Sequence, residues 1–298
     1  MGRLELERRV SVPPHGDPIH LDVRGAGKDG RTSVVLVAHG FKGFKDWGFF
    51  PYLCEQLAED GHTVVSFNFS LGGVGQDLEH FVDLDAFKRN TFTRELADLN
   101  WLIDQARAGV FTGDTPPSGL GLLGHSRGGG TAILAARTHT AVGSLVTWAA
   151  VSTFERWTET NLRDWEAQGV THTLNGRTGQ HMPLGVGLRD DLVENRDRLD
   201  ILAAAAANPS PWLIVHGEDD EAVPVTEAHA LNEASRSGVG GAPATLEILP
   251  DAGHTLGASH PMAEVPTALD RAVALSRAHF VRTLRDGVTL RTGTVTVP

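Results

Sequence analysis

The chain of 298 residues has few of the features that mark secreted or membrane-bound proteins. Its single cysteine, Cys54, excludes a disulfide within the chain and fits a reducing compartment, with the thiol buried as a structural residue. No run approaches the about 18 consecutive apolar residues that a membrane span needs. Residues 1–9 are charged and alternating, without the apolar stretch of a signal peptide. We therefore expect a cytoplasmic protein.

Basic residues are scarce relative to acidic ones. Lysine and arginine number 26 against 37 aspartates and glutamates, which gives a formal net charge of −11. Nucleic acids and anionic membrane surfaces bind proteins through a basic footprint, so this balance argues against both as partners. The hydrophobic share of 41% and the charged share of 21% are those of an ordinary globular protein. The composition leaves a homodimer open.

Motifs for cofactors are missing too. The glycines at 72–75 are not followed by the Gly-Lys-Ser/Thr of a phosphate loop, and those at 25–27 lack the order of a dinucleotide fingerprint. No His-Glu-x-x-His string occurs, and four further candidates lack the tight spacing of metal ligands: His172, His181, Asp190 and Asp191. We expect neither a cofactor nor a bound metal.

Strand-like and helix-like segments alternate along most of the chain. Two alternating segments around a Pro-Pro-His-Gly-Asp turn, 4–12 and 19–23, predict an antiparallel hairpin at a sheet edge. Apolar runs predict strands at 33–38, 63–69, 120–123, 144–149, 211–216 and 245–249, and helical spacing predicts helices at 49–60, 91–108, 127–137, 226–237 and 263–284. This order indicates an α/β fold with a mainly parallel sheet covered by helices on both faces. The threonine-rich tail at 288–297 is either an added edge strand or a disordered end.

The alternation breaks between residues 152 and 208. These about 57 residues are too many for a plain crossover between two strands. Apolar spacing predicts one helix around Trp157–Trp165 and another over 188–202, with a loop at 173–184 between them. We interpret 152–208 as a helical cap inserted into a single domain that spans 1–298. Its large apolar residues either shape a pocket or form the core of the cap: Trp157, Trp165, Met182 and Leu184.

The segment Gly124-His125-Ser126-Arg127-Gly128 joins a predicted strand to a predicted helix. Small residues two positions before and after Ser126 let the chain reverse sharply and hold the serine hydroxyl clear of the backbone at the end of the sheet. A G-x-S-x-G string is weak alone, because the 34 glycines produce some by chance. The strand before it and the Ala-rich helix after it supply the context that the motif requires, and predict a nucleophile.

A serine nucleophile needs a base, and the base needs an acid that orients it. In this type of sheet the expected chain order is serine, acid, histidine. His254 follows the last predicted strand in a glycine-flanked loop and is the candidate base. Four acids follow the strand before it, 218–221; we choose Asp220 and keep Asp219 as the alternative. Asp251 is interpreted as a turn residue.

The oxyanion of a tetrahedral intermediate needs two fixed donors. One is the backbone amide of Arg127, at the start of a helix whose dipole also favours negative charge. The other is expected from the loop His39–Lys45, where the amide of Phe41 lies between two glycines. His39 is expected to fix this loop by hydrogen bonds and His125 to pack beside the serine. Lys42 and Lys45 either pair with an acidic substrate or are solvated.

These segments resemble the serine branch of the α/β-hydrolases. The resemblance rests on His39-Gly40-Phe41, Gly124–Gly129, His216 through Asp220 and Gly253-His254, and spans roughly residues 20–285. It implies an α/β-hydrolase fold with an eight-stranded sheet. The nearest groups are dienelactone hydrolase-like, cinnamoyl-esterase-like and prolyl-oligopeptidase-like bacterial hydrolases, and one subgroup also carries segments similar to 39–50 and 175–180. Dienelactone hydrolases proper use a cysteine nucleophile, which Ser126 argues against here.

The predicted function is hydrolysis of small-molecule carboxylic esters, with short acyl chains, through an acyl-enzyme on Ser126. The same residues would serve an acylaminoacyl- or dipeptidyl-type peptidase or a thioesterase. Such peptidases carry a β-propeller before the hydrolase domain, and about 25 residues precede the first strands here, which favours the esterase. A third hypothesis is a ligand-binding protein on a hydrolase scaffold, without turnover. Fold alone does not choose among these, since one fold hosts many chemistries.

Overall fold

The computed structural model describes residues 5–25, 32–75, 80–238 and 243–285. The tail at 288–297, for which the sequence leaves two interpretations, lies outside these residues.

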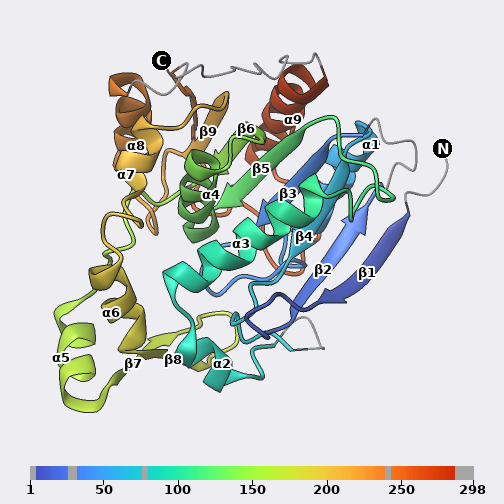
Figure 1. Ribbon diagram of the computed structural model, residues 1–298. Coiled ribbons are helices and arrows are strands. Elements are labelled where there is room, and N and C mark those ends of the chain that lie inside the picture. The colour runs from blue at the N-terminus through green and yellow to red at the C-terminus, as the bar shows by residue number, and fades with distance from the viewer. Residues whose placement is uncertain (1–4, 26–31, 76–79, 239–242, 286–298) are drawn as a thin grey trace, which may run out of the picture.

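An eight-stranded sheet forms the centre of the molecule, in the order β1-β2-β4-β3-β5-β6-β9-β10 (Figure 1). Its strands are β1 (Leu6–Ser11), β2 (Ile19–Arg24), β3 (Val34–Ala38), β4 (Thr63–Phe67), β5 (Leu120–His125), β6 (Val142–Trp148), β9 (Trp212–Gly217) and β10 (Thr245–Leu249). The pairs β1–β2 and β2–β4 are antiparallel, and every other pair is parallel. The predicted edge hairpin and the predicted mainly parallel sheet are both confirmed.

Helices cover both faces of this sheet because its central strands are apolar on both sides. Along β3, Val35 and Val37 pack into a hydrophobic cluster with α1 (Phe50–Glu59) and α9 (Thr267–Phe280). Val34 and Leu36 point the other way, into a cluster with α3 (Phe92–Arg107), α4 (Arg127–Thr138) and α8 (Val225–Ser237). Cys54 on α1 is fully buried, as expected, and burial raises the pKa of its thiol to about 11.

The last helix differs from its prediction over 263–284. It begins only at Thr267, after Pro266, and ends at Phe280 in a π-helical turn, Val281–Arg285. Pro261 and Pro266 explain the late start, since a proline favours extended backbone in the residue before it.

The insertion between β6 and β9 is not wholly helical, which corrects the expectation of a helical cap. It contains α5 (Glu159–Gln168), a two-stranded antiparallel hairpin of β7 (Val170–Leu174) and β8 (His181–Gly185), α6 (Gly187–Glu194) and α7 (Ile201–Ala206). The loop predicted at 173–184 is therefore mostly hairpin, and the helix predicted over 188–202 is broken in two. A short helix that the sequence did not suggest, α2 (Leu84–Arg89), packs against β8.

The large apolar residues of the insertion form core rather than a pocket around Ser126. Trp165, Met182 and Leu184 are buried in the cluster that covers the α3–α4 face. The indole of Trp165 donates a hydrogen bond of 2.8 Å to the carbonyl oxygen of Leu184, which ties α5 to the hairpin. Trp157 packs on the edge of the same cluster.

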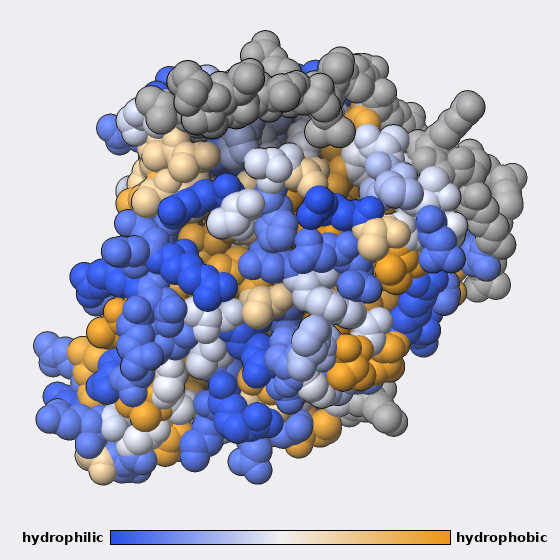
Figure 2. All heavy atoms as spheres, in the orientation of Figure 1, coloured by the Kyte–Doolittle hydropathy of each residue, from blue (hydrophilic) through white to orange (hydrophobic). Residues whose placement is uncertain are grey.

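Hydrophilic side chains cover most of the face shown in Figure 2, with hydrophobic side chains in separate patches between them. Among the residues that the structure describes, no helix combines the length and the apolar character needed to cross a bilayer.

Candidate active site

Ser126 occupies the sharp turn between β5 and α4. Its backbone has φ 57° and ψ −122°, a conformation that costs a non-glycine residue about 1 kcal/mol or more and is held by its surroundings. The Ser126 amide donates a hydrogen bond of 2.9 Å to the carbonyl oxygen of Trp148 on β6. The predicted strand–turn–helix context is confirmed, with the serine at the carboxyl end of a central strand.

Two glycines allow the loop after β3 to lie against this turn. A Cβ on Gly40 would come within 2.8 Å of the Cβ of Ser126, and a Cβ on Gly128 would collide with the carbonyl oxygen of His39. Only glycine fits at such distances. The backbone that leads into Phe41 therefore packs directly beside Ser126.

The structure brings His254 and Asp220 to Ser126 from two different loops. His254 Nε2 lies 3.1 Å from Ser126 Oγ, and His254 Nδ1 lies 2.8 Å from Asp220 Oδ2. Both loops follow parallel strands, β9 and β10, whose carboxyl ends meet at the same edge of the sheet as that of β5. Of the two acids considered, Asp220 is buried and contacts the histidine, whereas Asp219 is exposed. Asp251 lies in the turn after β10, as expected.

The Asp220 carboxylate is held in a fixed orientation. Its Oδ1 accepts hydrogen bonds of 2.9 and 2.8 Å from the amides of Ala222 and Val223, which leaves Oδ2 facing His254. Burial acts to raise the pKa of this carboxyl. Hydrogen bonds from His216, His254 and the Val223 amide outweigh burial and hold the pKa well below its ordinary value. A carboxylate in this position favours the His254 tautomer that carries its proton on Nδ1, which leaves Nε2 as an acceptor facing Ser126.

Two further histidines beside the site remain neutral. Burial lowers the pKa of His39 to about 4 and that of His125 to about 3. His39 Nδ1 lies 2.9 Å from the Gly40 carbonyl oxygen, and its Nε2 accepts a hydrogen bond from the Phe69 amide. His125 Nε2 lies 3.0 Å from the backbone oxygen of His254. His39 thus fixes the loop after β3 by hydrogen bonds, as predicted. His125 is buried beside Ser126, as predicted, and also contacts the backbone of His254.

The side chains of the two predicted oxyanion residues stack on one another. The guanidinium carbon of Arg127 lies 3.9 Å from the centroid of the Phe41 ring. Arg127 Nη1 pairs with Glu95 of α3 at 3.3 Å, and Glu95 also accepts a hydrogen bond of 2.7 Å from Asn90. This stack connects the backbone of the loop after β3 to the first turn of α4. The sequence analysis did not identify Glu95 as a residue of the site. Its position on the apolar face of a predicted helix could have indicated a buried, paired acid.

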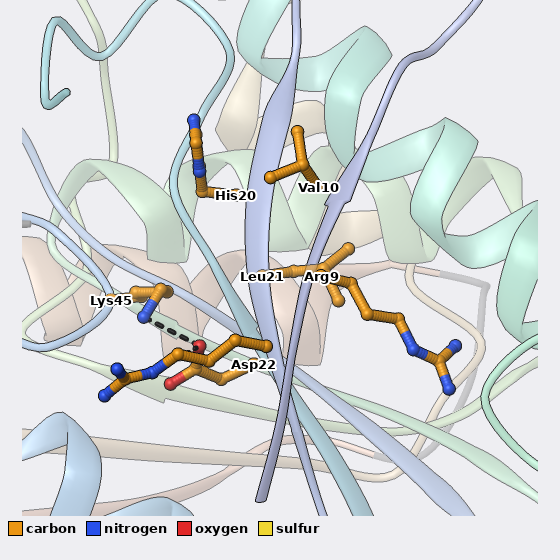
Figure 3. A pocket seen from close by; sticks show the side chains of 7 residues that line it. Arg9, Val10, His20, Leu21, Asp22 and Lys45 are labelled. Atoms are coloured by element: carbon orange, nitrogen blue, oxygen red, sulfur yellow. Dashed lines mark ion pairs between the residues drawn. The ribbon is translucent and has the colours of Figure 1, made fainter. Parts of the chain in front are cut away.

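Lys45 anchors the other end of the same loop. Its side chain is 2% exposed, and its Nζ lies 2.8 Å from Asp22 Oδ1 on β2 and 2.6 Å from Asp46 Oδ2. Figure 3 shows Lys45 pointing toward Asp22 in a cavity of about 300 Å³ that does not include Ser126. Arg24 pairs with the other Asp22 oxygen at 3.3 Å. Lys45 is a buried structural cation. Both alternatives predicted for it, pairing with an acidic substrate and exposure to solvent, are therefore wrong.

Replacing Asp22 with asparagine is expected to lower the free energy of unfolding by about 3 kcal/mol, because two buried cations lose their shared counter-ion. Urea unfolding of both proteins would measure the difference. Asp104→Asn is the matched control: its pair with Arg107 is exposed on both sides, and its loss should change the free energy of unfolding by less than about 1 kcal/mol. An equally small effect of Asp22→Asn would show that the cluster does not anchor the loop.

A cavity of about 200 Å³ opens onto Ser126 and His254. The loop after β3 forms one wall, and the turn of the β7–β8 hairpin contributes Asn175 and Arg177. The remaining lining residues are Gly40, Phe41, Lys42, Gly43, Trp47, Phe50, His125 and Thr255. Phe41 thus lines the cavity, while Phe44 is fully buried. The sequence did not identify Asn175 or Arg177 as lining residues, because nothing local indicates that this turn reaches Ser126.

No cluster of three or more histidine, cysteine or acidic residues within the described ranges is arranged to hold a metal ion.

Comparisons with known proteins agree with this architecture. The sequence profile described as the Alpha/beta hydrolase family matches residues 34–268. No curated protein matches the sequence significantly. A candidate hydrolase from Agrobacterium vitis S4 is similar in structure, with a TM-score of 0.69 and 17% identity over 93% of this chain and 99% of that chain.

Two further solved structures are similar. Est1E from Butyrivibrio proteoclasticus, with ferulic acid bound, has a TM-score of 0.65 and 16% identity over 95% of this chain and 96% of that chain. Dienelactone hydrolase from Anabaena variabilis ATCC 29413 has a TM-score of 0.60 and 17% identity over 95% of this chain and 100% of that chain. At such identities these likenesses show a shared fold alone.

Proposed function

Since the chain belongs to the α/β-hydrolase family, we propose that it is a serine hydrolase that cleaves small carboxylic esters through an acyl-enzyme on Ser126. The observation that carries this proposal is the continuous hydrogen-bonded series from Ser126 Oγ through His254 to the buried Asp220. A cavity of about 200 Å³ beside Ser126 suits a small substrate.

In the first half of the reaction Ser126 Oγ attacks the ester carbonyl carbon, and its proton passes to His254 Nε2. Asp220 stabilises the imidazolium that forms. The carbonyl oxygen becomes an oxyanion, for which the amides of Phe41 and Arg127 are the proposed donors. When the intermediate collapses, the bond to the alcohol oxygen breaks and that oxygen takes the proton from Nε2. The acyl group remains on Ser126.

Deacylation repeats the sequence with water. His254 Nε2 takes a proton from the water molecule, whose oxygen attacks the acyl carbon. Collapse of the second intermediate breaks the bond to Oγ and returns the proton from Nε2 to Ser126. The acid product leaves, and the enzyme is restored without a cofactor.

Pre-steady-state assays and covalent labelling test this proposal together. With 4-nitrophenyl acetate and butyrate we expect a burst of 4-nitrophenol close to the enzyme concentration, because 4-nitrophenolate is a good leaving group and acylation should be faster than deacylation. A fluorophosphonate should label Ser126, mapped by peptide mass spectrometry, and abolish the burst. Matching aminoacyl 4-nitroanilides should be cleaved much more slowly. Labelling without turnover of any ester would instead favour a ligand-binding protein, and faster anilide cleavage would favour a peptidase.

A further inference from the structure

Residues 174–177, which are the last residue of β7 and the first part of the turn after it, are here called the 174–177 turn. Asn175 and Arg177 of this turn line a wall of the Ser126 cavity that the proposed mechanism does not use. Lys42, from the loop after β3, donates a hydrogen bond of 2.9 Å from Nζ to the Leu174 carbonyl oxygen. This bond ties the turn to the loop that carries Phe41. The turn is therefore fixed at the site, where it can contribute to binding.

Asn175 in this turn presents an unused donor. The residue is 5% exposed and lines the cavity, and its Nδ2 has no hydrogen-bond partner among the residues that the structure describes. Its Oδ1 accepts a hydrogen bond of 3.2 Å from the Arg177 amide, which identifies Nδ2 as the group left over. A buried NH₂ group without an acceptor loses its hydrogen bonds to water without replacing them, which costs free energy. An acceptor supplied by a substrate would recover this cost.

The charges around Asn175 indicate which acceptor fits. Lys42 and Arg177 both line the cavity and place two positively charged side chains beside the Asn175 amide. Arg177 lies over the Phe44 ring, with its guanidinium carbon 4.9 Å from the ring centroid. Two cations and one neutral donor beside Ser126 favour an anion over a neutral acceptor.

We propose that the 174–177 turn is a specificity site for esters that carry a carboxylate, which Asn175 Nδ2 binds together with the cations of Lys42 and Arg177. This inference deepens the proposed function and rests on it. A carboxylate accepts up to about four hydrogen bonds and matches the planar donors of an amide and a guanidinium. This site uses side-chain groups, whereas the proposed oxyanion donors are the backbone amides of Phe41 and Arg127.

Space for a longer substrate arm lies next to the turn. A second cavity, of about 460 Å³, shares Arg177 and is lined otherwise by Thr178, Gln180 and residues of two neighbouring loops, His80, His260 and Pro261. A substrate arm that extends past Arg177 would enter this cavity. We consider a carboxylate on either the acyl side or the alcohol side of the ester.

Two matched pairs of esters test the proposal on the full-length protein. Mono-4-nitrophenyl adipate is compared with the 4-nitrophenyl ester of adipamic acid, and 4-acetoxybenzoate with 4-acetoxybenzamide. In each pair the shape is kept and the charge is removed. We expect kcat/KM to be at least about tenfold higher for the charged member of one pair than for its neutral partner. This charged-to-neutral ratio should fall toward one in ~0.5 M salt, which screens the attraction. Equal values in both pairs would overturn the inference.

Variants connect the preference to the turn. Asn175→Asp places a like charge beside the carboxylate and should lower the charged-to-neutral ratio below one, and Arg177→Gln should lower it several-fold. Arg163→Gln is the matched control, because Arg163 is an exposed cation of α5 that lines neither cavity, and it should leave the ratio unchanged. A ratio that survives both turn variants would also overturn the inference.

Failure of the proposed function has a different signature. If none of the four esters is hydrolysed and the fluorophosphonate does not label Ser126, the serine hydrolase proposal fails. If the neutral esters are hydrolysed with a burst but no charge preference appears, only the specificity site fails.

Discussion

Replacing Ser126 with alanine is expected to lower kcat for 4-nitrophenyl butyrate by about 10⁵-fold, on the order of the loss when a serine triad loses its nucleophile. The variant keeps His254, Asp220 and the proposed oxyanion donors but has no oxygen to carry the acyl group. The burst of 4-nitrophenol should disappear, and the remaining rate should be that of binding and oxyanion stabilisation alone. Stopped-flow and steady-state assays measure both.

Two controls separate loss of chemistry from loss of fold. Ser126→Gly removes the same oxygen, so it should be as inactive as the alanine variant. Glycine adopts φ 57° without strain, so this variant should be at least as stable to urea as the alanine variant. Ser237→Ala removes an exposed serine at the end of α8 and should keep full activity. If Ser126→Ala kept more than a few per cent of the wild-type rate, the acyl-enzyme mechanism would be wrong.

The sheet could be predicted because its elements are encoded locally. β3 is an uninterrupted apolar run and β9 begins with one, and α3 has clear helical spacing, so pattern alone located them to within a few residues. The turn at Ser126 could also be predicted from the sequence, because its conformation requires small residues on either side. Chain order then placed an acid after β9 and a histidine after β10.

The insertion was less predictable because its hairpin is short and only partly buried. β7 has five residues, of which Thr171 alone is fully buried, so the alternation that marks a strand is weak. The turn between the strands reaches Ser126 through contacts between distant segments, such as that of Lys42 with Leu174. No local pattern reports contacts of this kind.

Buried charges were missed for a related reason. Lys45 and Asp22 are separated by 23 positions; Lys45 lies on a loop, and Asp22 lies on β2, the strand next to the edge strand β1. Charged residues are ordinarily solvated, so their burial was not expected. The roles of Lys45 and Asp22 follow from three-dimensional packing, and the sequence alone supplies only their charge. Glu95 differs, because its place on the apolar face of a predicted helix was a signal, while its partner Arg127 could be identified only from the structure.

Replacing Asp220 with asparagine is expected to lower kcat by about 10⁴-fold while the fold is retained. The amides of Ala222 and Val223 both need an acceptor, so the side-chain oxygen of the asparagine should stay with them and its NH₂ group should face His254. Two donors would then meet at Nδ1, and the imidazole would shift its proton to Nε2. In that tautomer His254 cannot accept the proton of Ser126. Steady-state kinetics with 4-nitrophenyl butyrate measure the loss.

Asp219→Asn is the matched control, because it makes the same change one residue away on an exposed side chain, and it should keep wild-type activity.

The pH dependence of stability supplies a second readout for Asp220→Asn. The pKa of Asp220 is lowered in the folded state, so its charge stabilises the fold above the ordinary carboxyl pKa of about 4, and this stabilisation is lost as the pH falls toward the folded-state pKa. Urea unfolding should therefore show wild type more stable than Asp220→Asn at ~pH 7, with the difference shrinking below ~pH 4. A constant difference across this range, or an active Asp220→Asn enzyme, would show that the charge of Asp220 is not what orients His254.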